Sequence, residues 1–553
     1  MLFRSALGQV PDMVFRSCTA PARAIGTIAS WRGISTASEL PRSENAASIA
    51  SMQSGMARSG STSSLVNKIT GTFLLVWSDD KSSGKTLAKA RDEGQLPGTI
   101  ERLARSVLDA PPASDAAIEQ AKLLLLDTIS CGFAGGSEAV AQAVVKTALA
   151  SAGAGPCAVI GYAKHLGALG AVLANGAAVR VLDLNDYIVG TSANGEPESG
   201  GHPSDNIPVA LAVGTERARS GRDVLNAIAV GYELYARLQR SMDRGGNWDG
   251  VTATGLVAPA MAGMLMGMGQ GPLTHALALG AARATTPSIV RGGDISATKS
   301  IANALVAQAG VQAALLAEQG VTGPLAVLDH ERGLRDIFAR RETLTAPFTS
   351  EGAITGAHIK AYPCINTAQS AVAAALQLHP QFKQCAVTRV EVTMADYKVV
   401  KRHQDDEARS HPKSREGADH SFPFLIAVAL IDGALTIAQF ECERWRDENV
   451  KQLMAKIVMR RDKSWNERAP GSYPCSLRIT DDAGHVFEAE VPYPPGFSRN
   501  GLDRDTVFSK FHAVTEPILN PSARERIVDA VMQFDHSPSL AVLNAAISKG
   551  TAK

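Results

Sequence analysis

The sequence has little net charge, few aromatic residues and few cysteines. Its 55 lysines and arginines are balanced by 54 aspartates and glutamates, so the formal charge is only +1 over 553 residues. A nucleic-acid-binding protein usually carries a basic excess, and this balance therefore argues against that class. The seven cysteines are scattered and odd in number, which is not the pattern of a disulfide framework.

Three further patterns are absent from the sequence. No run of 18 or more apolar residues occurs, so no transmembrane helix is expected. There is no C-x-x-C pair of the kind that holds an iron–sulfur cluster, and no H-E-x-x-H zinc motif. His403, His411 and His420 flank an acidic run, which we interpret as an exposed loop rather than a metal site. The sequence thus predicts acid–base chemistry without a metal or another cofactor.

The first hundred residues differ in composition from the rest. Residues 1–38 contain four arginines and many serines and threonines, but no lysine and one acidic residue, Asp12. This composition is typical of a mitochondrial presequence. We therefore expect residues 1–40 to direct import into the matrix, with a cytoplasmic location as the alternative. Residues 41–96 are predicted to be a disordered linker or an insertion.

The remaining sequence predicts a mainly α fold with a large all-helical domain and a smaller α+β lid domain. Over residues 97–345, alanine-rich apolar segments at helical spacing alternate with glycine breaks. Between 346 and 499 the pattern changes. Residues 386–400 alternate apolar and polar side chains, and 476–491 predict two strands around a turn. Residues 500–553 are helical again and are expected to return to the first domain.

Polar segments interrupt the apolar helices, and enzymes place their chemistry on such loops. The first contains Asp183, a glycine-rich stretch and His202, and a helix is expected to begin at Ser204 or Asp205. The free N–H groups of a helix start suit carboxylate or phosphate ligands. His202, directly before it, is placed to protonate a leaving group or to hold an anion.

Three more segments carry candidate functional residues. Asp249 follows Trp248, and is either a base with a raised pKa or a helix N-cap. Arg291 and Lys299 are cations in an otherwise apolar neighbourhood, where they would bind a carboxylate. Lys360 precedes a Tyr-Pro-Cys turn. Together the segments indicate an α-rich enzyme that acts on an anionic substrate.

In their order along the chain, these segments resemble the MmgE/PrpD family, which contains 2-methylcitrate dehydratase and cis-aconitate decarboxylase. The matching motifs are D-x-N-D-Y, G-H-P-S-D-N-I, T-K-S-x-A-N-A, I-K-x-Y-P and S-R-E-G-A-D-H-S-F-P. The resemblance runs from about residue 97 to the C-terminus. It implies an active site between a helical domain and an α+β lid, a homodimer, and no metal requirement in the decarboxylase branch.

The resemblance also implies a set of site residues. Carried over by position, the active-site set of the decarboxylases falls on Asp183, Tyr187, His202, Asp249, Lys299, Lys360 and Tyr397. Adding the polar segments, we expect catalytic roles for His202, Asp183, Asp249 and Lys299. Substrate-binding roles are expected for Tyr187, Ser204, Arg291, Lys360 and Tyr397.

Two departures bear on the reaction. The decarboxylases have threonine in place of Tyr187 and histidine in place of Asp249, so the sequence favours the dehydratase side. The leading prediction is a hydro-lyase that dehydrates 2-methylcitrate, or a related alkylcitrate, by metal-free acid–base elimination. A cis-aconitate decarboxylase that makes itaconate is the alternative, and an isomerase is a third possibility within the family. The alternative of a different class is a non-catalytic binding protein on the same fold. The expected partner is a small tricarboxylate, not nucleic acid or a membrane.

In this mechanism Lys299, Lys360 and the helix start at Ser204 would hold the substrate carboxylates. Asp183 or Asp249 would remove the proton α to a carboxylate if burial raised its pKa. His202 would then protonate the departing hydroxyl.

Overall fold

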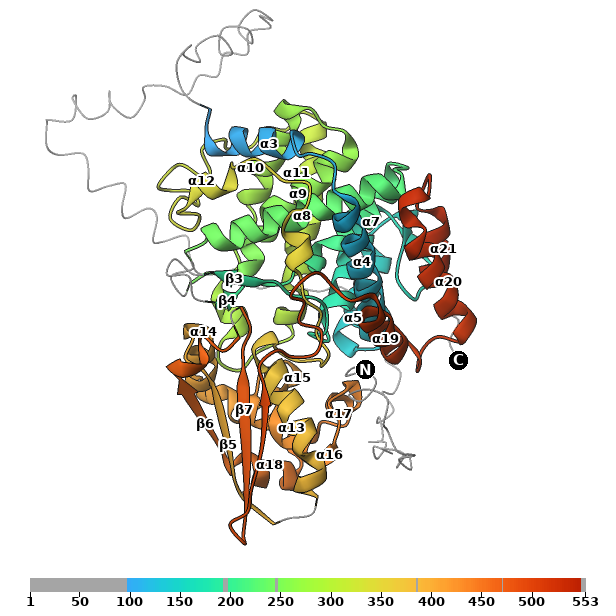
Figure 1. The fold of residues 1–553 in the computed structure, drawn as a ribbon. Coiled ribbons are helices and arrows are strands. Elements are labelled where there is room, and N and C mark those ends of the chain that lie inside the picture. Colours follow the sequence, from blue (N-terminus) through green and yellow to red (C-terminus); the bar gives the residue numbers. More distant parts are fainter. Residues whose placement is uncertain (1–96, 192–196, 244–246, 384–385, 470, 549–553) are drawn as a thin grey trace, which may run out of the picture. The chain divides into compact units, whose positions relative to one another are not determined.

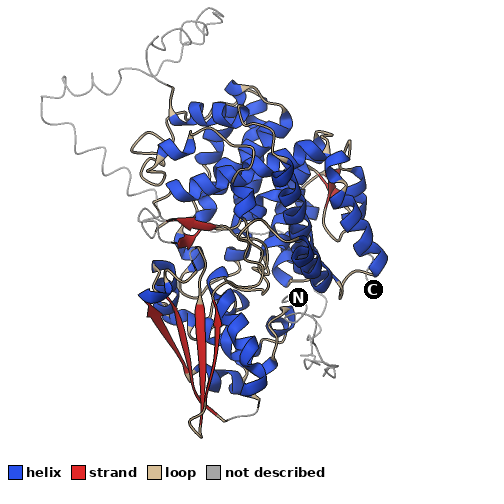
Figure 2. Ribbon diagram, in the orientation of Figure 1, coloured by secondary structure: helices blue, strands red, loops and turns tan. Residues whose placement is uncertain are grey.

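The computed structural model describes residues 97–191, 197–243, 247–383, 386–469 and 471–548. The described residues belong to one compact unit. The predicted presequence (1–40) and linker or insertion (41–96) lie outside them. Most of the described chain is helical, with one sizeable sheet (Figures 1 and 2). The predicted fold class, mainly α with a smaller α+β part, is confirmed.

The first part, here called the helical lobe, has one large apolar core that holds residues between Ile100 and Ile359. Ser114 begins the long helix α4, because its side chain accepts a hydrogen bond from the N–H of Ala117. The helices of this part are α3 (Thr99–Leu108), α4 (Asp115–Gly135), α5 (Ala139–Ser151), α6 (Ala168–Arg180), α7 (Ile207–Glu216), α8 (Gly221–Ser241), α9 (Thr254–Met266), α10 (Gln270–Ala281), α11 (Thr298–Glu318) and the short α12 (Arg341–Leu344). Two small antiparallel hairpins accompany them, β1 (Ala154–Ala158) with β2 (His165–Leu166) and β3 (Val189–Thr191) with β4 (Pro197–Ser199).

Small residues let these helices approach closely, as their abundance in the sequence predicts. A Cβ on Gly135 of α4 would lie 2.0 Å from the carbonyl oxygen of Ala178 in α6. Among the described helices, α11 alone is long and apolar enough to cross a membrane by length and composition. It packs against α6, α9 and α10, and the core helix of a soluble protein passes the same test.

The second part, here called the α+β lobe, has its own core between Ala361 and Val491. Its sheet has the order β6-β5-β7-β8, in which β6 lies parallel to β5 and the other pairs are antiparallel. The strands are β5 (Val387–Ala395), β6 (Ile457–Asp462), β7 (Cys475–Asp481) and β8 (Val486–Val491), and the helices are α13 (Gln369–Phe382), α14 (Lys398–Asp405), α15 (Arg415–Ala418), α16 (Phe422–Asp432), α17 (Ile437–Glu441) and α18 (Glu448–Met454).

Three of these strands are those predicted from alternation. The edge strand β6 was not predicted, because it is only half covered and ends in charged residues. The core of the α+β lobe also begins later than the expected boundary at residue 346. Phe348, Ile354 and Ile359 pack in the helical core instead.

The chain returns to the helical lobe through α19 (Arg504–Thr515), α20 (Pro521–Met532) and α21 (Ala541–Ser548). Both α19 and α20 contact α4. Lys510 of α19 forms a buried ion pair with Asp127 of α4, with an N–O distance of 2.6 Å, and also donates to the carbonyl of Leu184. The C-terminal helices thus support the loop that follows α6, which carries the first polar segment.

Candidate active site

A cavity of about 450 Å³ is lined by residues of both lobes. Its wall is unusually rich in ionisable side chains. The cationic and imidazole groups are Arg180, Arg291, Arg402, Arg409, His202, His403 and His420, and the carboxylates are Asp183, Asp205, Asp249, Asp405 and Asp406. Such a concentration of arginine and histidine in a concave site suits a small polyanion.

Asp183 is the centre of the buried charge cluster. It follows the end of α6 with a φ of 51°, in the left-handed region that few residues other than glycine adopt. Its carboxylate contacts Arg180 at 2.7 Å, Lys299 at 3.1 Å, and Lys360. Burial alone would raise the pKa of Asp183, but these three cations hold it well below its usual range. Asp183 is therefore a fixed negative charge, and its pKa is lowered, whereas the base role predicted from the sequence requires a raised one.

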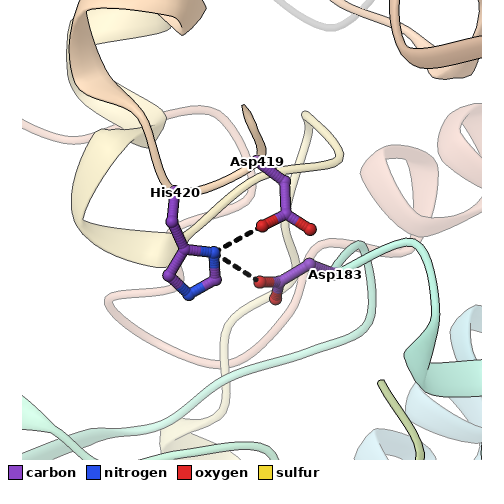
Figure 3. Close-up of side chains that lie close together, drawn as sticks. All are labelled: Asp183, Asp419 and His420. Atoms are coloured by element: carbon purple, nitrogen blue, oxygen red, sulfur yellow. Dashed lines mark hydrogen bonds and ion pairs between the residues drawn. The ribbon is translucent and has the colours of Figure 1, made fainter. Parts of the chain in front are cut away.

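Lys299 links Asp183 to the α+β lobe. Its ammonium lies 2.7 Å from both carboxylate oxygens of Asp419, which directly precedes His420. Nδ1 of His420 donates to Asp419 and lies 3.7 Å from Asp183 (Figure 3). Burial, with Lys299 adding to it, lowers the pKa of His420 to about 3, so the imidazole is neutral and its Nε2 is unprotonated.

The ligand atoms of Asp183, Asp419 and His420 lie within 4.8 Å of one another, a spacing that would suit a metal ion. The Lys299 ammonium, however, contacts both carboxylates at 2.7 and 3.1 Å, and so takes the place between them where a cation would bind. A divalent ion there would also face Arg180 and Lys360. These residues fit a network of ion pairs better than a metal centre.

His202 has a defined tautomer and an open face toward the cavity. Its Nδ1 lies 2.6 Å from the carbonyl oxygen of Asp186, which can only accept, so Nδ1 carries the proton. Its Nε2 lies 3.9 Å from the Asp183 carboxylate. Burial lowers the pKa of His202 well below its usual value, and Arg180 and Lys360 add to this effect. At neutral pH, Nε2 therefore presents a lone pair, whereas the acid role predicted from the sequence requires a protonated His202.

The segment after His202 differs from the predicted helix start. Pro203–Asn206 forms one 3₁₀ turn, and α7 begins at Ile207 without a side-chain cap. The prediction that Ser204 or Asp205 caps this helix is wrong. The Ser204 hydroxyl instead donates to the Asp186 carboxyl at 2.5 Å, and the Tyr232 hydroxyl donates to it at 2.7 Å.

Asp205 lines the cavity beside Arg180. One of its oxygens accepts a hydrogen bond from Asn185 at 2.8 Å, and the other lies 3.6 Å from Nε of Arg180. Burial raises the pKa of Asp205 to about 6, even though Arg180 and Arg291 lower it. Asp205 is thus a carboxyl group that can hold a proton when a polyanion enters.

The sequence allowed two roles for Asp249, a base or an N-cap. In the structure its carboxylate caps the turn Gly250–Ala253, because it accepts a hydrogen bond from the N–H of Val251 at 3.0 Å. Its second oxygen accepts from Nε of Arg291 at 2.7 Å. The two residues form an ion pair in the cavity wall, next to Trp248.

Four of the nine predicted site residues line the cavity: Asp183, His202, Asp249 and Arg291. Lys299, Lys360 and Ser204 lie behind the wall, bound to the carboxylates just described. Tyr187 and Tyr397 are buried and do not line the cavity, and the Tyr397 hydroxyl donates to the carbonyl of Asn466. The catalytic role of Lys299 and the substrate-binding roles of the other four residues stay predictions.

The cavity-lining residues of the α+β lobe were not predicted from the sequence. His403 and His420 were expected in an exposed loop, but they are only 5% and 4% exposed and line the cavity, so that expectation is wrong. His420 lies within the R-E-G-A-D-H-S motif, which was a usable signal. Nothing in the local pattern marked the other missed residues, which are Arg180, Asn366, Arg402 and Arg409.

A fixed carboxylate, a neutral histidine and a cavity rich in arginine suit acid–base chemistry on a small anion. The comparisons agree with chemistry of this class. Residues 101–346 match the MmgE/PrpD N-terminal domain and residues 362–535 match the MmgE/PrpD C-terminal domain. The chain belongs to the MmgE/PrpD family.

Relatives within this family carry two kinds of lyase name. A cis-aconitate decarboxylase-like protein of Aspergillus oryzae is 24% identical, over 78% of this chain and 93% of the relative. The human cis-aconitate decarboxylase is 25% identical, over 78% and 91%. The 2-methylcitrate dehydratase of Salmonella typhimurium is 26% identical, over 72% and 85%. The similarity supports a lyase of this family and does not separate the two activities.

Proposed function

We propose that the protein is a hydro-lyase that dehydrates 2-methylcitrate, or a related alkylcitrate, to the corresponding aconitate. One observation carries this proposal: His202 lines the cavity with its Nε2 unprotonated, 3.9 Å from a carboxylate that is held ionised. Elimination of water begins with removal of a carbon-bound proton, and this step needs a base that is free in the resting enzyme. A decarboxylation begins with loss of CO₂ and needs a proton donor instead.

The reaction starts when the arginines of the cavity bind the substrate carboxylates. This fixes the carbon acid against His202, and orientation supplies much of the rate. Nε2 of His202 removes the proton α to a carboxylate and becomes an imidazolium. The negative charge of Asp183, 3.9 Å away, stabilises that imidazolium, while the proton on Nδ1 stays bonded to the carbonyl of Asp186.

The carbon–oxygen bond then breaks, and the departing hydroxyl needs a proton to leave as water. Asp205 is our candidate donor, because its pKa is raised to about 6 and a bound polyanion raises it further. The electron pair of the broken C–H bond forms the double bond. Arginine side chains at the wall stabilise the charge that develops on the carboxylate during proton removal.

Cis-aconitate decarboxylation is the second candidate, because relatives with that name match the larger share of this chain. In that reaction a protonated Asp205 would deliver the proton to carbon after CO₂ leaves. The same cavity would hold the substrate, since both substrates carry several carboxylates.

The test is an assay of the full chain with 2-methylcitrate, citrate and cis-aconitate offered separately. Absorbance of the new conjugated alkene and mass spectrometry of the products distinguish loss of water from loss of CO₂. We expect water loss from 2-methylcitrate and at least about 100-fold less of it in His202→Gln. Loss of CO₂ from cis-aconitate, without dehydration, would replace the proposal with the second candidate. No reaction with any of the three would leave the binding-protein reading.

Mitochondrial import and a homodimer belong to the same proposal. Fractionation of cells that express the full chain tests the first, and light scattering of the purified protein tests the second.

A further inference from the structure

The wall that the α+β lobe contributes contains hydrogen-bond donors without acceptors. Nη1 of Arg409 and Nδ2 of Asn366 are buried and have no hydrogen-bond partner among the described residues. Both side chains line the cavity, and they are only 6% and 4% exposed. Buried polar atoms in folded proteins are nearly always paired, so two unpaired donors at one cavity wall require an explanation.

The rest of the Arg409 guanidinium is held in place. Its Nε donates to Asp406 at 3.0 Å, and its Nη2 donates to the carbonyl of Arg291 at 3.2 Å. Two of its three nitrogens therefore fix the plane of the group, and the third is unused. Burial lowers the pKa of Arg409, even though Asp406 raises it.

A chain of interactions connects Asn366 to Arg409. Asn366 precedes Thr367, whose hydroxyl lies 3.1 Å from Nδ1 of His403, and His403 is close enough to Arg409 for their charges to interact. A planar guanidinium and an amide N–H₂ in the wall of one cavity can each donate to an oxygen of a carboxylate.

We propose that Arg409 and Asn366 form a carboxylate-binding subsite that the α+β lobe adds to the cavity. The inference rests on the proposed function for its substrate class, a small tricarboxylate. Arg409 and Asn366 belong to the α+β lobe, whereas Asp183 and His202 belong to the helical lobe, so we assign to the subsite a carboxylate other than the one next to the reacting carbon. Arg409 and Asn366 thereby select substrates by the number of their carboxylates.

The test is calorimetric titration of the full chain with tricarballylate, which has the three carboxylates of citrate but no hydroxyl to eliminate. We expect Arg409→Met to weaken binding about 10- to 100-fold and Arg409→Lys to restore part of it. Asn366→Ala should weaken binding about threefold. Asn366→Asp should weaken it by more than about tenfold, since it sets one carboxylate against another. Lys401→Met, which removes an exposed charge from the same segment, is the matched control and should change binding less than about twofold.

A subsite also predicts coupling, because both side chains bind one group. The double variant Arg409→Met/Asn366→Ala should lose less affinity than the product of the single losses. Wild-type affinity in both Arg409→Met and Asn366→Asp overturns the inference, as does equal weakening by Lys401→Met or no binding by the wild type. Asn366→Asp is nearly isosteric, so it still tests the inference if Arg409→Met does not fold.

The outcome is separable from that of the proposed function. Tricarballylate binding that depends on Arg409, in a protein that converts none of the three substrates, supports the subsite and removes the hydro-lyase. Turnover of 2-methylcitrate that is unchanged by substitution of Arg409 and of Asn366 supports the hydro-lyase and removes the subsite.

Discussion

The two walls of the cavity differ in how their charged groups are paired, although Nε of Arg180 on the helical side also lacks a hydrogen-bond partner among the described residues. On the helical side, Asp183 contacts three buried cations and His202 is locked by the carbonyl of Asp186. On the α+β side, Arg409 and Asn366 keep donors that no described residue satisfies. A wall in which charges of opposite sign are paired holds its groups in place and sets protonation states, as a reacting group requires. An incompletely paired wall is suited to a ligand that supplies the missing acceptors.

The largest effect is expected from substitution of Asp183, the carboxylate at the centre of the buried charge cluster. Asp183→Asn keeps the left-handed backbone, which asparagine tolerates, but leaves Arg180, Lys299 and Lys360 without their shared anion. Loss of one partner of a buried pair costs about 3–5 kcal/mol. Urea unfolding should show this loss, and turnover should be abolished. Asp432→Asn removes the partly exposed pair with Arg444 and should cost less than about 1 kcal/mol.

The next largest effect is expected on kcat, with little change in stability. His202→Gln should lower kcat about 100- to 10,000-fold with little change in Tm, because it removes the base but keeps a donor for the carbonyl of Asp186. His485→Gln is a suitable control, since that exposed histidine lies on the loop between β7 and β8. A His202→Gln enzyme with undiminished kcat would exclude His202 as the base.

The loop that carries His202 should tolerate no side chain at position 201. Gly201 has a φ of +83°, and a Cβ there would lie 2.3 Å from the Tyr235 hydroxyl, which receives the N–H of His202. Gly201→Ala should cost about 1–3 kcal/mol and lower kcat. Gly153→Ala, where no atom lies within 4 Å of the added Cβ, is the control. If thermal unfolding shows equal stabilities for the two variants, the loop is less constrained than its contacts indicate.

The smallest expected effect is a change in pH dependence. The rate constant kcat/KM reports the free enzyme, so it should fall on the acid side as His202 protonates, well below pH 6.5, and on the alkaline side as Asp205 ionises, near its pKa of about 6. Asp205→Asn should lower the maximum and remove the alkaline limb. Measurement of kcat/KM between pH 4 and pH 8 checks this, over roughly the range that these pKa values span. An alkaline limb that survives in Asp205→Asn assigns the acid to another group.

The sequence predicted the long elements because each has a strong local signal. The alternation of β5 and the N-cap of α4 can both be recognised from residues that are adjacent in the sequence. The parallel edge strand β6 lacked such a signal, since its pairing with β5 is made across about 65 residues of chain and its exposed face is charged.

Composition and motif order by themselves determined the fold class, the family and four residues of the cavity wall. Only the tertiary structure decided protonation states and partners, because these depend on groups that are distant in sequence. Asp183 changes from a predicted base to a fixed anion because Lys299 and Lys360 reach it from other segments. His202 is neutral, with its proton on Nδ1, because burial lowers its pKa and the carbonyl of Asp186 accepts that proton in a hydrogen bond. Arg409 and Asn366 enter the site only because the α+β lobe brings its loops to the same cavity.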